Sequence, residues 1–534
     1  MSTTSKLLGL AVAGAIVGGC QELAVTNPND PNREQATGQP AAVEALISSA
    51  FSTWWFVVHD DEPGWGLSSM ADEFNGGFLD FGLHHSSQEP RQAWINTSTF
   101  TYNNMTETPW YNLHSVVSNV NDALVAMDRG VLPAEAARAR AVAKFMQGVS
   151  HGYLALYFDS AFVATELVDL DTITVPQLHP YPVVMDTALS ELQQAIAIAQ
   201  ANTFTVPGPP GWFRTPVSST DLVRLAHSFI ARFLISEPRD RAGRDTVDWT
   251  LVLSHAEQGI QTDFRPEGEP GVFENGFTFR AARQRTTTPS DFARPDMWLL
   301  GPSDSADSFI RWVNQAVENR NTFRDTIQLR ARDRRIHGSA GPGSRGAYFG
   351  YHRASVWDPS RGTYIWSNYA YYRLGTGTTW QTGPQLAMTA AEMNFIRAEA
   401  LIRLGRAAEA VPLINNTRVA NGQLPPVTDS GPPDVPGCVP RKYMPGPTQG
   451  ACGSLWDALR YEKRIEMAGV DPTVAYFDAR GWQTLTENTF VHLPVPGREL
   501  EVLQRPLYTY GGGLAWSAPA PDPERCPVAL PRCP

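Results

Sequence analysis

Paired helical stripes set the strongest limit on how this chain can fold. One apolar stripe at helical spacing runs through residues 110–127, and a second runs through residues 133–158. Between them stands Arg-Gly-Val-Leu-Pro, a break that turns one helix back along another. The same spacing predicts helices from about Pro40 to 56 and at 184–199, 222–233, 249–260, 391–404 and 407–417.

Alanine at the expected close contacts of these pairs predicts a mainly α fold of tetratricopeptide-like helix pairs. The spacing is irregular, so a uniform solenoid is not expected. No sustained strand alternation and no regular exchange of strands with helices is found, which predicts little β structure. The Pro/Gly/Thr-rich stretches 201–217 and 266–346 are predicted to be long surface loops, where function tends to lie.

The start of the chain is predicted to be a lipoprotein signal peptide, residues 1–19. After Lys6 comes a run of roughly 13 apolar or small residues, which is too short to span a bilayer. The run ends in Val-Gly-Gly-Cys, which resembles a bacterial lipobox and makes Cys20 the predicted site of lipid attachment. The alternative is an ordinary signal peptide with an incidental cysteine. Residues 20–39 are then an extended tether, and 40–534 a single helical domain with long loop insertions.

Composition excludes some functions. The apolar fraction of 42% is that of a globular protein. A net charge of −11, without a long Lys/Arg run, argues against a nucleic-acid partner. The 15 tryptophans are partly core, but some are candidates for an exposed stacking surface of the kind that holds sugars.

The remaining cysteines are Cys438, Cys452, Cys526 and Cys533. In an exported protein, four cysteines suggest two disulfides. Proximity favours Cys438–Cys452 and Cys526–Cys533, and the alternative is free buried thiols. None of the spacings resembles a zinc site.

Motifs for catalysis and cofactors are missing from the sequence. It contains no nucleophile elbow, zinc-protease helix, Walker loop or dinucleotide fingerprint, and we expect no cofactor. Acidic runs at 60–62, 72–73 and 169–171 could coordinate structural Ca²⁺, but none has EF-hand spacing. A solvated acidic loop is therefore the favoured interpretation, and no metal site is predicted.

The stretch 459–482 concentrates charge, with Glu462, Glu466 and Arg464 on one expected helix and Asp478 and Arg480 beyond it. Such residues could form a catalytic cluster or a clip that ties the helix to its neighbours. The glutamates lie one turn apart, and Arg464 is at a spacing that meets neither. We favour the clip, and expect Arg464 or Arg480 to bind a carboxylate or the carbonyls at a helix end.

Several stretches resemble the SusD/RagB family of nutrient-uptake lipoproteins, in the same order along the chain. They are 390–427, with its Ile-Arg-Ala-Glu-Ala core, 459–482, and His-Leu-Pro-Val-Pro-Gly-Arg-Glu-Leu at 492–500. Residues 110–124 and 139–162 match the family more loosely. Lys463, where the family has Arg, and Asp-Pro-Thr-Val at 471–474 mark a divergent member.

This resemblance implies a binding protein and not an enzyme. It implies a lipoprotein anchored in the outer membrane, facing the cell surface, that captures an oligosaccharide, or a peptide as the less favoured choice. The protein would close as a lid over a SusC-like TonB-dependent transporter. The alternatives are a helical-repeat scaffold for other proteins and, less favoured, a surface hydrolase.

Two aromatic clusters in predicted loops are the candidate ligand surface, because aromatic rings stack on sugar faces and nearby polar groups fix the hydroxyls. The alternative is that the rings pack beneath the loops. The ligand-binding candidates are Trp65, Asp72, Asn75, Trp94 and Tyr102 in the first cluster, and Tyr351, Trp357, Tyr364, Trp366 and Tyr369 in the second.

Overall fold

The computed structural model describes residues 36–520, except for gaps at 61, 77–81, 83–84, 87, 169–175, 275–292, 317–318, 321–326, 341–342, 353–366, 375–381 and 443–449. Within this part of the chain most of the regular structure is helical, and the strands are only two or three residues long. The prediction of a mainly α fold is confirmed.

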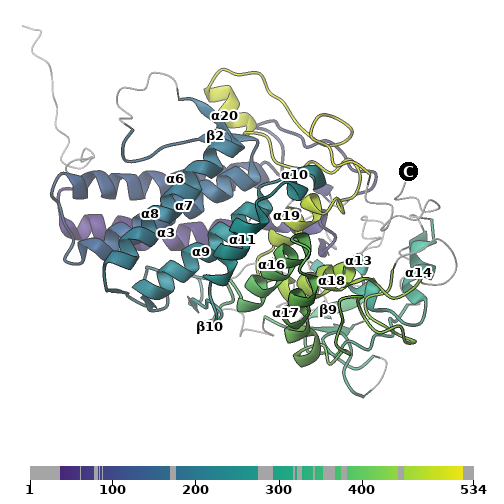
Figure 1. Ribbon diagram of the computed structural model, residues 1–534. Coiled ribbons are helices and arrows are strands. Elements are labelled where there is room, and N and C mark those ends of the chain that lie inside the picture. Colours follow the sequence, from purple (N-terminus) through teal and green to yellow (C-terminus); the bar gives the residue numbers. More distant parts are fainter. Residues whose placement is uncertain are drawn as a thin grey trace, which may run out of the picture.

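The long helices stack side by side in one half of the molecule (Figure 1). The first pair is α6 (Asn104–Asp128) and α7 (Ala136–Tyr157), and α3 (Pro40–Trp55) packs on α6. The next are α8 (Tyr181–Ala201) on α7, α9 (Ser219–Ser236) on α8, α11 (Trp249–Glu257) on α9, α16 (Ala390–Arg403) on α11, and α17 (Ala407–Ala420) on α16. Each segment that periodicity predicted to be a helix is therefore helical.

Small residues on α7 allow its neighbours to come close. A Cβ atom at Gly152 would lie 2.1 Å from the ring of Phe233 on α9. A Cβ atom at Gly148 would lie 2.7 Å from Leu192 on α8. Glycine is disfavoured within a helix by roughly 0.5–1 kcal/mol relative to alanine. Its presence here is explained by the close packing of three helices.

Side-chain caps fix where several helices begin. Ser218 accepts a hydrogen bond from the backbone N–H of Asp221 at the start of α9, and Thr389 caps α16 in the same way. Helix α18 (Leu455–Met467) begins with a reciprocal capping box between Ser454 and Asp457. Such caps satisfy backbone donors that a helix leaves unpaired at its first turn.

The other half of the molecule is rich in loops, whereas short helices and small antiparallel strand pairs occur in both halves (Figure 1). The short helical elements along the chain are η1 (Phe56–Asp60), α4 (Gly64–Met70), α10 (Arg241–Asp245), α13 (Met297–Leu300), η5 (Gly301–Ser303), α14 (Ser308–Val313), α19 (Val474–Gly481) and α20 (Gly497–Val502). The strand pairs are β1 (Phe74–Gly76) with β7 (Ala293–Pro295), β2 (Ser160–Phe162) with β3 (Leu178–Pro180), β4 (Thr205–Val206) with β5 (Val217–Ser218), β6 (Glu267–Gly268) with β10 (Gly383–Pro384), and β8 (Phe349–Tyr351) with β9 (Tyr369–Tyr371).

Helix α18 joins two hydrophobic cores. Leu455 and Leu459 pack in the main core with the long helices. Tyr461 and Ile465, on the following turns, pack in a second core that lies under the loop-rich half. That second core also holds α13, α14 and the β8–β9 pair. Composition predicted a surface loop at 266–346, but much of the described part of 293–346 is a packed layer.

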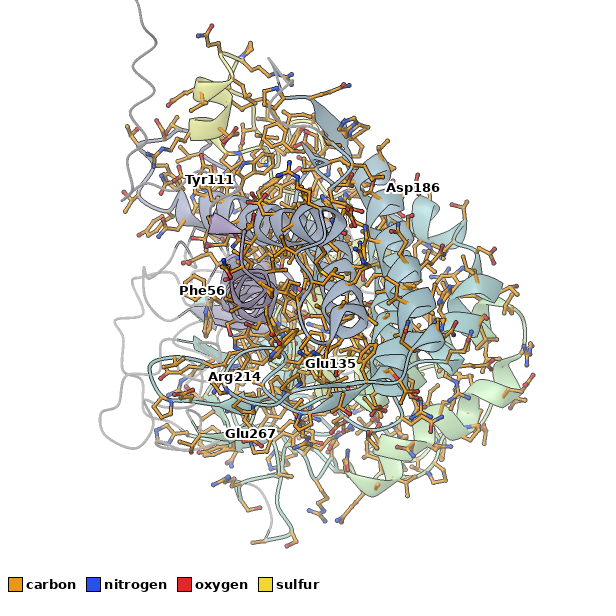
Figure 2. All side chains as sticks on the ribbon, turned by 90° about the vertical axis from the view of Figure 1, so that its left-hand side faces the viewer. Phe56, Tyr111, Glu135, Asp186, Arg214 and Glu267 are labelled. Carbon is orange, nitrogen blue, oxygen red and sulfur yellow. A yellow bond between two sulfur atoms is a disulfide. The ribbon has the colours of Figure 1, made fainter. Side chains whose placement is uncertain are left out.

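The segment Pro40–Met70 is long and apolar enough to cross a membrane by length and composition, with a mean hydropathy of 1.4, which is a weak indication. Val43, Ile47 and Trp54 of its first helix, α3, are buried in the main core, so α3 is a core helix. Figure 2 shows the molecule from the left-hand side of Figure 1, which is the end with the long helices. Phe56 and Tyr111 lie at the surface there, and side chains fill the space between the helices.

Candidate functional site

The charged residues of α18 are ion-pair partners inside the fold. The Arg335 guanidinium lies 2.7 Å from Glu462 and 2.9 Å from Glu466, and it binds Asp333 at 2.6 Å. Arg418 adds a second guanidinium, 3.1 Å from Glu462. At most 1% of each of these side chains is exposed. The glutamates therefore act as the clip that we predicted, and they have no access to a substrate.

Electrostatics agree with this structural role. Burial lowers the pKa of Arg335, but Asp333 and Glu462 outweigh that effect and hold it well above its ordinary value. Burial raises the pKa of Glu462, while Arg335 and Arg418 oppose the rise. Tyr348 and Asn421 each donate a further hydrogen bond to Glu466, at 3.0 Å. The cluster is saturated with partners, as buried charges must be.

Arg464 and Arg480 both bind carbonyl oxygens near helix ends, as expected. Arg464 donates to the carbonyls of Ala71 and Asp72, which follow α4, at 3.0 and 2.8 Å. Arg480 donates to Leu156 in the last turn of α7, at 3.2 Å, and to Ser236, the last residue of α9, at 2.6 Å. Both cations thus satisfy carbonyls that a helix leaves unpaired.

Lys463 stands where the family resemblance expects arginine, and it too forms a buried ion pair. Its Nζ lies 2.7 Å from Asp478, and Asp478 also binds Arg244 at 3.0 Å. Arg244 in turn holds Glu399 through two hydrogen bonds, at 3.0 and 2.7 Å. The substitution therefore retains a positive charge that ties α18 to α19.

The first predicted ligand cluster lies largely in the interior. Trp65 and Trp94 are 2% and 1% exposed, and Asp72 and Asn75 are 0% exposed. Asn75 donates to Asp296 at 3.3 Å across the β1–β7 pair, and Asp72 accepts from Arg91 at 3.4 Å. Tyr102 is half-buried beside Phe100. Four of the five predicted residues thus have no face open to a ligand here, because they pack beneath the loops.

The second predicted cluster is described only in part. Tyr369 is 1% exposed and its hydroxyl lies 3.2 Å from His337, so it belongs to the second core. Tyr351 is half-buried and packs edge-on to Tyr369, with 5.6 Å between ring centroids. Trp357, Tyr364 and Trp366 lie outside the described residues, and their role as ligand contacts stays a prediction.

The predicted Cys438–Cys452 disulfide is confirmed, with 5.7 Å between the Cα atoms. Cys526 and Cys533, like Cys20, lie outside the described residues. In the part of the chain that is described, no group of three or more His, Cys, Asp or Glu side chains is arranged to hold a metal ion.

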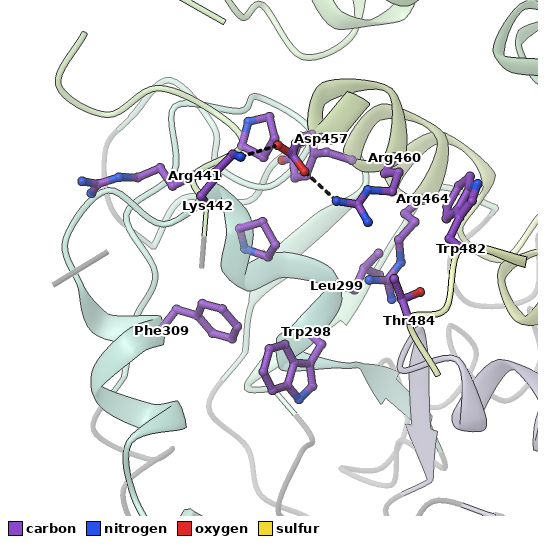
Figure 3. Close-up of a pocket in the computed structure, with 13 residues that line it drawn as sticks. Trp298, Leu299, Phe309, Arg441, Lys442, Asp457, Arg460, Arg464, Trp482 and Thr484 are labelled. Atoms are coloured by element: carbon purple, nitrogen blue, oxygen red, sulfur yellow. Dashed lines mark hydrogen bonds and ion pairs between the residues drawn. The ribbon is translucent and has the colours of Figure 1, made fainter. Parts of the chain in front are cut away.

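A cavity of about 120 Å³ lies where α18 meets the loop-rich half (Figure 3). Trp298 from α13 and Phe309 from α14 lie on the side opposite Asp457 and Arg460 of α18. Trp482 lies near Arg460, and further lining residues include Arg441, Lys442, Tyr461 and Arg464. Aromatic walls with a few polar groups are typical of ligand sites.

This cavity is basic. Among the described residues that line it, Asp457 is the one carboxylate, and it lies 2.6 Å from Arg460 and 3.9 Å from Lys442. Burial by itself would raise the pKa of Asp457, but Arg460 and the hydrogen bonds from Ser454 hold it below its usual value. Burial lowers the pKa of the Arg464 guanidinium, which donates hydrogen bonds to the carbonyls of Ala71 and Asp72.

Sequence reasoning missed this site because its parts are far apart along the chain. Trp298 and Phe309 stood in a stretch predicted to be a surface loop, and Arg460 belonged to a helix interpreted as a clip. One signal in the sequence could have found it. Arg460 and Arg464 lie one turn apart on the same face of α18, so this helix presents a charged face beside its apolar one.

Comparison of the sequence with protein families and with curated proteins gives no match. Comparison of the fold does. A SusD superfamily protein from Bacteroides vulgatus superposes over 87% of this chain and 97% of its own, with a TM-score of 0.56 and 11% identity. The fold is that of the SusD superfamily.

Further solved structures support this assignment of the SusD fold. A SusD superfamily protein from Parabacteroides distasonis matches 88% of this chain and 99% of its own, with a TM-score of 0.54 and 12% identity. A SusD homolog from Bacteroides thetaiotaomicron matches 83% and 89%, with a TM-score of 0.53 and 14% identity. The resemblance noted in the sequence therefore extends to the fold, while the sequences have diverged widely.

Proposed function

We propose that this chain is a nutrient-binding lipoprotein of the outer-membrane surface that delivers its ligand to a SusC-like TonB-dependent transporter. The observation that supports this most is the SusD fold, which extends over nearly the whole length of the solved SusD superfamily structures. The lipobox-like leader ending at Cys20 fits the same role, because an acyl anchor would hold the folded domain at the membrane.

A binding role also fits the chemistry of the described residues. The carboxylates that stand out in the sequence, Glu462 and Glu466, are neutralised by arginine and closed to solvent. A glycoside hydrolase of the usual kind would need an accessible pair of carboxylates across a cleft. The protein would therefore hold its ligand without changing it, and the transporter would supply the energy coupling.

The proposal is tested by expressing the full chain together with a SusC-like transporter and purifying it from the membrane fraction. We expect the chain to co-purify with a TonB-dependent barrel and to be released from the membrane fraction when Cys20 is replaced by alanine. A Cys438→Ala variant, which leaves the leader intact, serves as the control and should stay in the membrane. The proposal would be contradicted if both variants, or neither of them, left the membrane fraction and no transporter barrel co-purified with the chain.

A further inference from the structure

Arg460 and Trp482 line two cavities at once. The inner cavity, of about 120 Å³, is the one that Trp298 and Phe309 border. The outer one measures about 480 Å³ and is lined also by Arg241, Arg403 and Trp456. Because the same two side chains border both spaces, the cavities adjoin each other. We call the two together the α18 cleft.

Among the described residues, cations outnumber the carboxylates that pair with them along the α18 cleft. The cationic side chains that line it are Arg241, Arg403, Arg441, Lys442, Arg460 and Arg464. The carboxylates within ion-pair distance of any of them are Asp245, Asp307, Glu399 and Asp457, counted among the described residues. Within the described part of this chain of net charge −11, six cations thus face four carboxylates along the cleft, and such a local balance favours anions.

Glu399, one of these four carboxylates, does little to neutralise the cations of the cleft. Glu399 is 1% exposed and is already bound through two hydrogen bonds by Arg244, which does not line the cleft. Arg403 therefore shares it only at 3.6 Å. Arginine is also the side chain best suited to hold a carboxylate, because its planar fork presents two parallel N–H donors.

Aromatic rings accompany the cations. Trp456 is half-buried in the outer cavity, with the guanidinium of Arg403 4.9 Å from its ring centroid. It meets Trp482 edge-on at 6.1 Å, and Trp298 and Phe309 continue the aromatic lining in the inner cavity. Flat aromatic rings match the apolar C–H faces of sugar rings. A peptide chain of acidic residues also carries negative charge, but it has no such ring face.

We propose that the α18 cleft binds an oligosaccharide whose sugars carry carboxylates, namely a chain of uronic acid residues. The indole of Trp456 stacks on a sugar ring, and Arg460, at the junction of the two cavities, holds a carboxylate. This assignment of a ligand class rests on the proposed role in nutrient capture, and it specifies where and by which chemistry the ligand is held.

Calorimetry on the mature chain tests the proposal, with trigalacturonate as the probe and a neutral trisaccharide as its comparison. We expect trigalacturonate to bind at least about tenfold more tightly than the neutral sugar, and affinity to fall as salt rises, because salt screens charge. Arg460→Gln and Trp456→Ala should each weaken trigalacturonate binding about tenfold or more. The second variant keeps the test informative if the first fails to fold.

Matched controls come from the same chain. Arg406 pairs with Glu409 three residues away, as Arg460 pairs with Asp457, but it lies outside the cleft. Trp516 is 48% exposed and also lies elsewhere. Arg406→Gln and Trp516→Ala should leave trigalacturonate affinity unchanged.

Two results would overturn the assignment. If the neutral sugar binds as tightly as trigalacturonate and Arg460→Gln has no effect, the ligand is held elsewhere, and the nutrient-binding role stands without this cleft. If hexaglutamate binds in the cleft and trigalacturonate does not, the ligand is an acidic peptide. Failure of the broader role is seen separately, as a chain that recovers no transporter barrel from membranes.

Discussion

Arg335 and Glu462 form an ion pair at 2.7 Å in which neither side chain is exposed to solvent. Arg335 belongs to the loop-rich half of the molecule, and Glu462 belongs to the helix that bridges the two cores. The pair therefore fastens the second core to α18, and with it the wall of the α18 cleft. A cluster that looks catalytic in the sequence is instead a support for the place where we propose that a ligand binds.

Removing Arg335 should destabilise the fold strongly. Arg335→Ala leaves the carboxylates of Asp333 and Glu462 buried without their main partner, which is expected to cost about 3–5 kcal/mol. Urea denaturation monitored by tryptophan fluorescence measures this loss. The exposed Arg406→Ala variant is the control and should unfold at the midpoint of the unsubstituted chain. Equal midpoints for both variants would show that the buried pair does not hold the halves together.

Arg480 should matter for folding and not for binding. Its guanidinium donates to the backbone carbonyls of Leu156, Ser236 and Val491, so Arg480→Ala leaves three buried acceptors with one partner fewer. We expect a lower folding yield and a loss of roughly 3 kcal/mol or more, since hydrogen bonds from charged donors contribute about 1.5–3 kcal/mol each. Trigalacturonate affinity of the surviving folded protein should be unchanged. A folded variant with normal stability and lost affinity would place Arg480 in a ligand site instead.

Glu73 should make stability depend on pH in an unusual direction. Burial raises its pKa to about 8, although the Ser68 hydroxyl opposes the rise. The folded state then holds a proton that the unfolded state, with an ordinary glutamate pKa near 4.3, releases. Stability from this group is thus present below pH 4.3 and is lost as pH rises toward 8, by about 1.4 kcal/mol per pH unit at most.

The Glu73→Gln variant tests this, since glutamine cannot ionise. We expect the unsubstituted chain to lose stability relative to the variant between pH 5 and pH 8, measured as the difference between their thermal midpoints in matched buffers. Because the difference removes the contribution of all other groups, a constant value across this range would show that Glu73 is ionised in the folded state.

The helices could be read from the sequence because their information is local. Ser218 and Thr389, for example, cap helices whose apolar stripes begin directly after them. The partner of Glu462 could not be read in this way. Arg335 lies 127 residues away, and nothing within either segment specifies the other.

The exposure of the aromatic rings predicted to bind ligand could not be read from the local sequence either. Aromatic residues in a Gly-rich stretch suit an exposed stacking surface and a core beneath loops equally well. Trp65 and Tyr369 fall in the second core, which forms only when β7, α13 and α14 come together from a segment without a helical period. The fold was therefore largely predictable from the sequence, whereas the α18 cleft depends on contacts between distant segments.

The Cys438–Cys452 disulfide should support both stability and the cleft. It closes a loop with a sequence separation of 14, and Pro440, Arg441 and Lys442 on that loop line the inner cavity. Replacing both cysteines by alanine should lower the free energy of unfolding by about 3 kcal/mol, the value expected for a loop of this length. Because the loop carries two cations of the cleft, trigalacturonate affinity should fall as well. Reduction with dithiothreitol should lower both quantities more in the unsubstituted chain than in the double variant, in which only the predicted Cys526–Cys533 pair is left to reduce. An unchanged affinity in the double variant would show that the loop keeps its place through its other contacts, such as the hydrogen bond from the Arg441 N–H to the Pro302 carbonyl at 2.9 Å.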